Sequence, residues 1–183
     1  MIPREKIQFH LQLIIWVINY LKLNQIYKID LVNVANILQY SPFKELNDYD
    51  KEVLVYNQYS LTQIDTAIPK LLSCLDFYKL SEKKKLDKVL RLCKPIPLVQ
   101  ALKLLSGDFL CEQIRKYAVS SLELASLIDI QEHLLQIVQA LKYEMYHDSF
   151  LARFILKKAI QNPLNLGIHL ITTYFKVIVY FGI

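Results

Sequence analysis

Three residues whose side chains could bind a metal or move a proton lie close together in the last third of the sequence. Glu144, His147 and Asp148 fall within five positions, in the segment YEMYHDS. A metal site of the H-E-x-x-H kind places its ligands on one face of a single helix. Here the residues straddle the end of one predicted helix and the start of the next. We therefore favour a turn over metal binding or catalysis: Asp148 would cap the following helix, and Glu144 and His147 would pair locally with Lys142 or the helix end.

Two arginines lie beside apolar stripes of predicted helices. Arg115 stands in the segment IRKYAV and Arg153 in the segment LARF. We expect each to form an ion pair across neighbouring helices, with Glu112 or Glu144 as the partner.

The remaining histidines and the cysteines offer no second cluster. The cysteines have no C-x-x-C pair, and an odd, scattered set indicates core thiols in a reducing compartment and no disulfide framework. Each isolated histidine is expected to be an ordinary surface or packed residue. These residues are Cys74, Cys93, Cys111, His10, His133 and His169.

The densest basic cluster of the chain, whose formal net charge is +5, lies in one short segment. It consists of Lys83, Lys84, Lys85 and Lys88. We favour a solvated helix face over a patch for phosphate or lipid headgroups, which stays open as the alternative. No zinc-finger spacing or RNA-binding motif accompanies it, so we expect no nucleic-acid partner.

The elements that position these residues are predicted to be helices. The 183 residues are 54% apolar and include only 3 Gly and 6 Pro, fewer than a barrel or sandwich with many tight turns needs. Before residue 64 we predict helices at Ile2–Leu23, Leu31–Leu38 and Lys51–Tyr59, the last preceded by an acidic loop at Pro42–Asp50. The later predicted inner faces are Ile68/Leu71/Leu72/Leu75, Leu86/Val89/Leu90/Cys93, Ile114/Ala118/Leu122, Leu134/Ile137/Val138/Leu141 and Phe150/Leu151/Phe154/Ile155.

The rhythm of helix, short turn and helix favours an all-α fold in which antiparallel helix pairs stack into an α-solenoid. The periodicity also permits a helix bundle. The segment KPIP at residues 94–97 should end one helix and start the next, and Gly107 suits the end of the helix before it. Two apolar stretches, Ile7–Leu23 and Gly167–Ile183, are interrupted by polar residues and read as buried or amphipathic helices. For the second, membrane docking or dimerisation is the alternative.

The helices on both sides of YEMYHDS carry a long and specific pattern. Gln136 to Glu144 reads QIVQALKYE, and Leu151 to Asn162 reads LARFILKKAIQN. Together with AIPKLLSCLDF, KPIPLVQALKLLS and IRKYAVSSLELA, these segments resemble the helical domain (accessory, or PIK, domain) of phosphatidylinositol 3-kinase catalytic subunits. The YHDS spacing makes the resemblance class I-like. It implies an armadillo/HEAT-like superhelix of stacked helix pairs.

An upstream segment extends the resemblance but departs from the family in two positions. Leu54, Tyr59 and Leu61 match the family's L-W-x-x-R-Y-x-L, while Val55 replaces the Trp and Gln58 the Arg.

The resemblance divides the chain into three parts. Residues 1–29 are an N-terminal helix without a match, residues 30–162 match the PIK domain, and residues 163–183 form a divergent apolar helix. In the last part only Gly167 and His169 loosely match the family's R-I-G-H-F.

The resemblance implies a non-catalytic scaffold, as a fragment or truncated homologue of a lipid kinase. The chain has no glycine-rich phosphate loop, D-R-H-x-x-N catalytic loop or D-F-G motif. We therefore expect no catalysis and no cofactor in this chain alone. The parent enzyme would use ATP and Mg²⁺ to phosphorylate the inositol 3-hydroxyl of phosphoinositides. A stand-alone α-solenoid that binds protein partners is the alternative.

The resemblance also points to a regulatory contact. Acidic residues at the positions of Glu45 and Asp48 contact an SH2 domain of a regulatory subunit in class I members, and carboxylates suit a basic phosphate pocket. A solvated acidic loop that caps the next helix is equally favoured. Expected partners are a regulatory subunit, or adjacent C2 and kinase domains of a longer chain. We expect a cytoplasmic protein whose membrane contact is at most peripheral.

Overall fold

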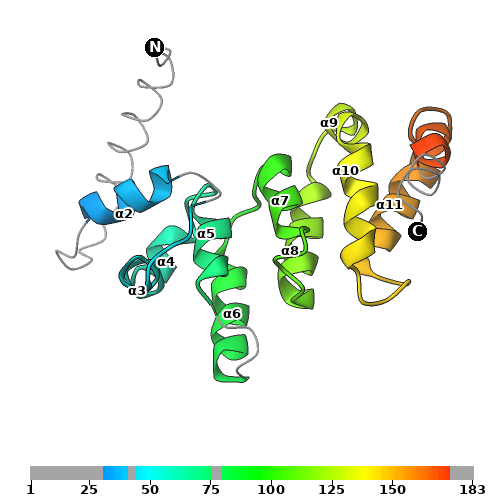
Figure 1. Cartoon of the computed structure of the whole chain (residues 1–183). Coiled ribbons are helices and arrows are strands. Elements are labelled where there is room, and N and C mark those ends of the chain that lie inside the picture. Colours follow the sequence, from blue (N-terminus) through cyan, green and yellow to red (C-terminus); the bar gives the residue numbers. More distant parts are fainter. Residues whose placement is uncertain (1–30, 41–43, 76–79, 174–183) are drawn as a thin grey trace, which may run out of the picture. The chain divides into compact units, whose positions relative to one another are not determined.

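The structure, a computed structural model, describes residues 31–40, 44–75 and 80–173, and every regular element within these ranges is helical (Figure 1). The chain divides into two compact units, Met1–Cys74 and Leu75–Ile183. The first contains α2 (Leu31–Gln39), α3 (Asp48–Tyr56), α4 (Gln58–Leu61) and α5 (Ile68–Ser73). The second contains α6 (Leu80–Leu92), α7 (Leu98–Leu104), α8 (Glu112–Leu122), α9 (Leu127–Glu132), α10 (Leu134–Gln139), the 3₁₀ turn η1 (Ala140–Tyr143), α11 (Phe150–Gln161) and the π-helical turn η2 (Pro163–Gly167).

The predicted all-α fold is confirmed by these elements. The stacking of helix pairs into a superhelix remains a prediction. The predicted helix Ile2–Leu23 lies outside the described residues, as does most of the final apolar segment. No described helix is both long and apolar enough to cross a bilayer.

The first unit is built around a small apolar core that all four helices share. Helix α3 packs against α2, α4 and α5. Ile37, Leu54, Leu61 and Ile68 are among its fully buried side chains. The predicted inner face of the α5 segment is confirmed, because Ile68, Leu71, Leu72 and Leu75 are all buried. Each such side chain contributes about 1.5–3 kcal/mol by leaving water.

The acidic segment before α3 is more helical than predicted. We expected a loop to Asp50 and a helix from Lys51, but α3 already begins at Asp48. The side chain of Asn47 accepts a hydrogen bond from the backbone N–H of Asp50 at 2.7 Å and caps the helix. The cap is therefore an asparagine, and two of the acidic residues belong to the first helical turn.

A lysine from α5 satisfies the C-terminal end of α2. The Lys70 ammonium donates to the carbonyl oxygens of Ile37, Leu38 and Tyr40 at 2.8, 2.9 and 2.7 Å. The last carbonyls of a helix have no partner within it and carry partial negative charge, so a cation there stabilises the end. This contact joins α2 to α5 inside the first unit.

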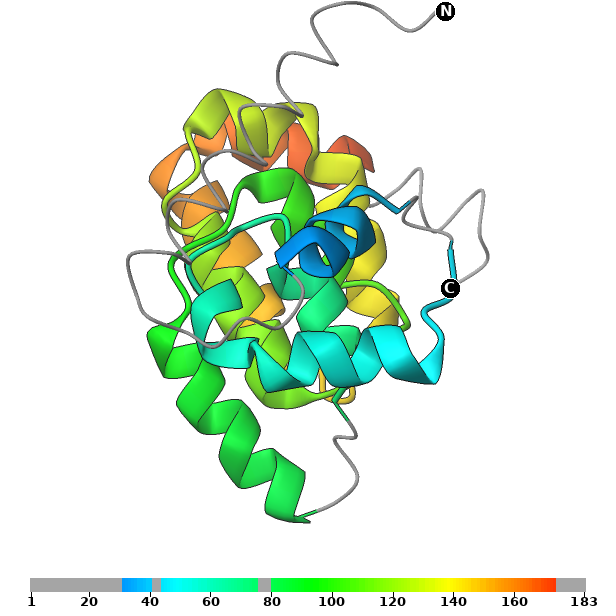
Figure 2. The same cartoon turned by 90° about the vertical axis from the view of Figure 1, so that its left-hand side faces the viewer.

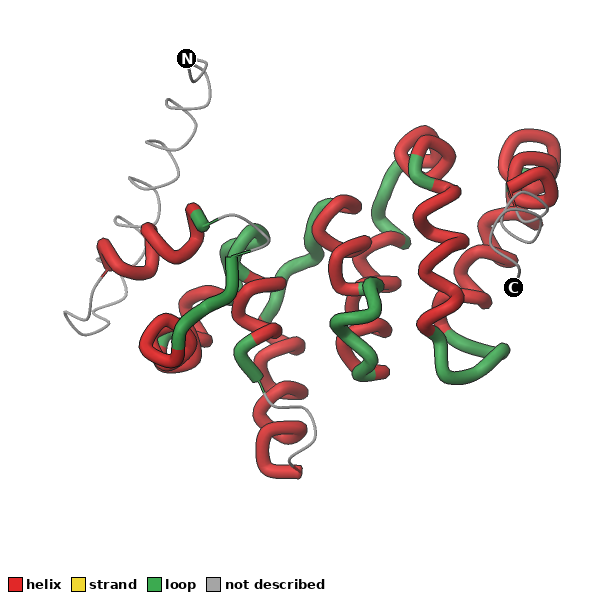
Figure 3. Tube along the Cα trace, in the orientation of Figure 1, coloured by secondary structure: helices red, strands yellow, loops and turns green. Residues whose placement is uncertain are grey.

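The second unit is organised around α8. Helix α8 packs against α6, α7 and α11, and short turns join the successive helices (Figures 2 and 3). Ile114, Ala118 and Leu122 have no exposed surface, which confirms the predicted inner face. The KPIP break is confirmed as well: α6 ends at Leu92, α7 begins at Leu98, and the N–H of Ile96 donates to the Ser121 hydroxyl at 3.3 Å.

One member of the predicted inner faces is turned outward. Phe150, the first residue of α11, is 37% exposed, whereas Leu151, Phe154 and Ile155 are buried. The Lys116 ammonium lies 4.8 Å from the centre of the Phe150 ring. A cation over an aromatic face is attracted by the ring electrons, so this ring packs against α8 at the surface and stays outside the core.

Candidate functional site

The three titratable residues of the segment YEMYHDS point to different surroundings. They lie in the turn between η1 and α11, but Glu144 reaches α8, Asp148 pairs with α11 and His147 is exposed. Within the described residues, no three His, Cys, Asp or Glu side chains converge as metal ligands do. The three groups therefore do not form one site, and the segment acts as a turn between two helices.

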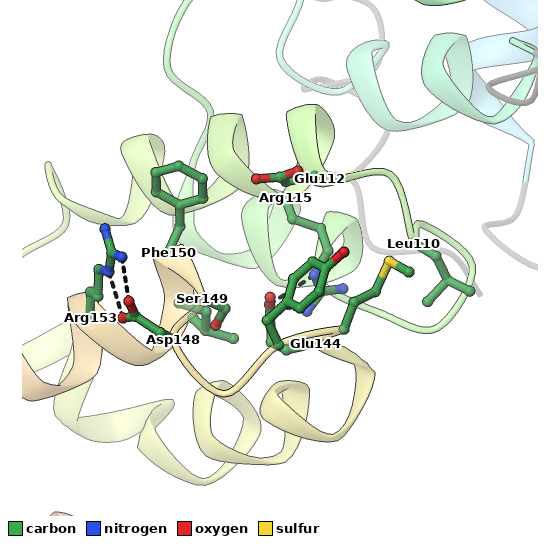
Figure 4. Close-up of a pocket in the computed structure, with 11 residues that line it drawn as sticks. Leu110, Glu112, Arg115, Glu144, Asp148, Ser149, Phe150 and Arg153 are labelled. Atoms are coloured by element: carbon green, nitrogen blue, oxygen red, sulfur yellow. Dashed lines mark hydrogen bonds and ion pairs between the residues drawn. The ribbon is translucent and has the colours of Figure 1, made fainter.

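Arg115 of α8 and Glu144 form a buried ion pair (Figure 4). One carboxylate oxygen, Oε1, accepts from Nε at 2.8 Å and from Nη2 at 2.6 Å. The side chains are only 5% and 12% exposed. Two hydrogen bonds to a charged donor fix the geometry and compensate for the loss of hydration. The expected pairing of Arg115 with Glu112 or Glu144 is thus resolved in favour of Glu144, and the predicted pairing of Glu144 with Lys142 was wrong.

The same guanidinium also satisfies backbone carbonyls from two separate turns. Nη1 donates to the carbonyl oxygens of Leu105, Ser106 and Phe109 at 3.0, 3.4 and 3.3 Å. Nη2 donates to that of Ala140 at 3.1 Å. The first three belong to the turn between α7 and α8, and the fourth to the start of η1. Arg115 therefore fastens both turns to α8.

Arg153 pairs with Asp148, not with Glu112 or Glu144 as predicted. Its Nε donates to Asp148 Oδ1 at 2.6 Å, and both side chains are more than half exposed. The hydrogen bond from Arg153 lowers the pKa of Asp148 below its ordinary value. The two residues are close in sequence at the start of α11, so a local partner prevails over a more distant one.

The cap of α11 is Ser149, which corrects the expectation for Asp148. The Ser149 hydroxyl accepts from the backbone N–H of Ala152 at 3.1 Å and the residue is buried. The carboxylate of Asp148 is engaged by Arg153 instead. A serine cap and a neighbouring ion pair together hold the start of α11.

A small pocket opens above the buried ion pair. Its volume is about 160 Å³. Its wall includes Leu110 from the turn before α8, Glu112 from the start of α8, Met145 from the turn before α11 and Phe150 from α11 (Figure 4). Leu110 is 48% exposed and Met145 71%. Pockets for cofactors or drug-sized ligands measure about 300–1,000 Å³. This hollow is therefore smaller than a usual cofactor pocket.

The predicted regulatory residues, Glu45 and Asp48, lie in the first unit. They are far along the sequence from the residues described above. Glu45 is exposed before α3, and the Asp48 side chain is 99% exposed and lies 3.5 Å from the Lys51 ammonium. Asp50, two residues later, is buried at the helix start. Both carboxylates are exposed and therefore accessible to a basic partner.

Two contacts of the second unit have no counterpart in the sequence pattern. Gly107 was expected to end the preceding helix, but α7 ends at Leu104. A Cβ at Gly107 would lie 2.8 Å from Cε1 of the Tyr143 ring, so the glycine allows this ring to approach the backbone. Lys157 of α11 pairs with Glu123 at the end of α8 at 3.0 Å. Both contacts join residues more than 30 positions apart, which helical periodicity does not relate.

Comparisons with known proteins give the context of this arrangement. Residues 22–177 match the sequence profile of the phosphoinositide 3-kinase family, accessory domain (PIK domain). The chain is 34% identical over 130 residues to phosphatidylinositol 3-kinase VPS34 of Arabidopsis thaliana and to the root isoform of phosphatidylinositol 3-kinase of Glycine max. It is 35% identical over 137 residues to phosphatidylinositol 3-kinase pik3 of Schizosaccharomyces pombe.

In each comparison the match covers 71% of this chain, but only 16% of the plant proteins and 17% of the yeast protein. The names of these relatives do not support a class I-like assignment, which stays a prediction, as do the boundaries at residues 29 and 162. The pattern around the turn and the buried Arg115–Glu144 pair thus belong to a known accessory domain, and this chain is a member of the phosphoinositide 3-kinase PIK domain family.

Proposed function

We propose that this chain serves as the non-catalytic helical scaffold of a phosphatidylinositol 3-kinase. The observation that carries the proposal is the buried Arg115–Glu144 pair. Its charged groups are engaged with each other, and the guanidinium also binds backbone carbonyls, so the pair holds turns together. A carboxylate fixed by two bonds to a guanidinium is a poor general base. The family match supports the same role, since a PIK domain is an accessory domain and not a kinase domain.

The catalytic parts would lie elsewhere in the parent enzyme. There the reaction would be transfer of the γ-phosphate of ATP, with Mg²⁺, to the inositol 3-hydroxyl of a phosphoinositide. The present chain does not fit these cofactors, because its sequence has no glycine-rich phosphate loop and no D-F-G motif. ATP and Mg²⁺ therefore belong to a kinase domain that acts beside this scaffold, in the cytoplasm and at a membrane surface.

The scaffold would also receive regulatory contacts. Glu45 and Asp48 are exposed and acidic, which suits the basic phosphate pocket of an SH2 domain. Charge reversal to Glu45→Lys and Asp48→Lys should abolish capture by such a domain, whereas Glu52→Lys, at another exposed acidic position of α3, should preserve it. Equal capture of all these variants would refute the SH2 contact.

A second role as a protein-interaction module is favoured by the pocket above the ion pair. Its rim exposes Leu110 and Met145, which are apolar and accessible. Such a rim suits an apolar anchor of a partner protein. The two roles are compatible, because a scaffold between domains must bind them.

A lipid-kinase assay tests the catalytic part of the proposal. The purified 183-residue chain is incubated with ATP, Mg²⁺ and phosphatidylinositol vesicles, beside a full-length phosphatidylinositol 3-kinase as positive control. The expected result is no phosphate transfer by the chain. Transfer above the no-enzyme background that persists through repurification would overturn the scaffold role.

A further inference from the structure

The basic residues of α6 lie on the side of the helix opposite its buried face. At 3.6 residues per turn, Lys84, Lys88 and Arg91 fall within about 60° of one another around the helix axis. All three side chains are exposed. Leu86 and Val89, on the other side of the helix, have no exposed surface. The helix is therefore fixed in rotation, with this basic face held outward.

Two further cations border this face, and little negative charge offsets it. Lys83 and Lys94 are exposed as well, and Asp87 is the one acidic residue between them. Within the described part of the chain, no ion pair or hydrogen bond engages the side chains of Lys83, Lys84, Lys88 and Arg91. Arg115, Arg153 and Lys157, by contrast, each form an ion pair. An unpaired, oriented set of cations is suited to an external anion.

The shape of this surface favours a bilayer over a nucleic acid. The stripe runs about 10 Å along a straight helix, and the N-terminal half of α6 extends past the other helices of its unit (Figures 1 and 2). No aromatic residue stands in α6, so the stacking that binds single-stranded nucleic acid has no platform there. Leu92, on the shoulder of the stripe, is 50% exposed and can enter the boundary between headgroups and acyl chains.

We propose that the face of α6 formed by Lys84, Lys88 and Arg91, together with the neighbouring Lys83 and Lys94, binds the surface of an anionic phospholipid bilayer. The choice of a bilayer rests on the proposed function, because a phosphatidylinositol kinase must work at a membrane that contains its anionic substrate. The interaction is electrostatic and peripheral. It assigns to this domain a membrane-facing side, in addition to its role between other domains.

Vesicle cosedimentation of the full 183-residue chain tests this surface. Three vesicle types are compared: phosphatidylcholine alone, and phosphatidylcholine with phosphatidylinositol or phosphatidylserine at equal surface charge. The test variant is Lys84→Gln/Lys88→Gln/Arg91→Gln. The matched control, Lys103→Gln/Lys116→Gln/Lys142→Gln, removes the same charge from exposed positions outside α6.

The wild-type chain should bind both anionic vesicles, not the neutral ones, and lose binding as salt shortens the range of the attraction. Each cation near an anionic surface contributes about fivefold in affinity, so the test variant should bind about 100-fold more weakly. The control triple variant should lose less than tenfold. Circular dichroism of both variants should match that of the wild type.

Equal loss in the two triple variants would overturn the proposal, because it would show an effect of net charge alone. Binding to neutral vesicles of the same strength would overturn it as well, in favour of an apolar contact. Binding of a single-stranded RNA probe through α6 without vesicle binding would do the same. A chain that binds vesicles through α6 and also transfers phosphate would contradict the scaffold role and leave the bilayer surface standing.

Discussion

Arg115 and Glu144 lie 29 positions apart in the sequence, yet their side chains meet at 2.6 and 2.8 Å in the interior of the second unit. The guanidinium adds bonds to carbonyls of two turns. A pair of this kind is costly to bury and more costly to break, because removal of one partner leaves the other charged, dehydrated and alone. It makes the position of the turn before α11 depend on α8.

Replacement of Arg115 with Met should strongly destabilise the second unit. The variant leaves the Glu144 carboxylate and several carbonyls without donors, so we expect a loss of about 3–5 kcal/mol in the free energy of unfolding. Urea denaturation followed by circular dichroism measures it. The matched control is Arg153→Met, which breaks an exposed pair and should change stability little. Arg115→Met/Glu144→Leu should be more stable than Arg115→Met. Similar stabilities of the two single variants would contradict the assigned role.

Ser149 and Asp148 provide a second comparison, between the observed cap and its neighbour. Ser149→Ala removes the acceptor of the Ala152 N–H and should cost about 0.5–2 kcal/mol. Asp148→Ala removes an exposed ion pair and should cost clearly less. The same denaturation experiment ranks the two variants. A larger loss for Asp148→Ala would restore the aspartate as the cap.

Gly107→Ala should destabilise the second unit by steric conflict. The new Cβ would approach the Tyr143 ring to 2.8 Å, and relief of such overpacking costs about 1–3 kcal/mol. Because the conflict is with one ring, the cost should fall in a Tyr143→Ala background. A double-mutant cycle measures this coupling. An unchanged cost in that background would mean that the ring does not set the requirement for glycine.

Cys74 and Cys93 should react slowly with iodoacetamide in the native chain. Burial raises the pKa of Cys74 to about 11 and that of Cys93 to about 12, so few thiolates exist near pH 8.5. Alkylation at these two sites, followed by mass spectrometry, should accelerate only as the pH approaches those values. In urea both thiols should react readily, which serves as the control. In the unfolded chain the two thiols have their ordinary, lower pKa and lose their protons at a lower pH than in the folded chain. The free energy of unfolding should therefore also fall as the pH rises above about 9. Fast native alkylation near pH 8.5 would contradict the burial.

The helical core could be predicted from the sequence because burial there follows the helical period. The stripe Ile114, Ala118 and Leu122 is one such case, and its burial is complete. At helix ends the helical period does not identify the capping residue, because neighbouring polar side chains compete for the free backbone N–H groups. At the start of α11, Asp148 and Ser149 are both good caps, and only the nearby Arg153 draws the carboxylate away.

The site was only partly predictable because its contacts span the fold. Glu144 was one of two proposed partners for Arg115. Apolar neighbours in the sequence and opposite charge predict that an ion pair forms, but they do not identify which carboxylate forms it. The approach of Tyr143 to Gly107 depends on how two turns meet, which no local pattern encodes. The exposed basic face of α6 was visible as a charge cluster, and the structure adds that the helix holds it opposite a buried face. The SH2 contact through Glu45 and Asp48 remains a prediction.

A domain exchange tests the central claim most directly. Residues 22–177 of this chain replace the matching segment of the Schizosaccharomyces pombe phosphatidylinositol 3-kinase pik3, and phosphorylation of phosphatidylinositol is measured on the purified, folded chimera. If the chain is a scaffold of such an enzyme, the chimera should retain activity, and Arg115→Met within it should reduce the activity through loss of folding. A folded and stable chimera that phosphorylates no lipid would contradict the scaffold role.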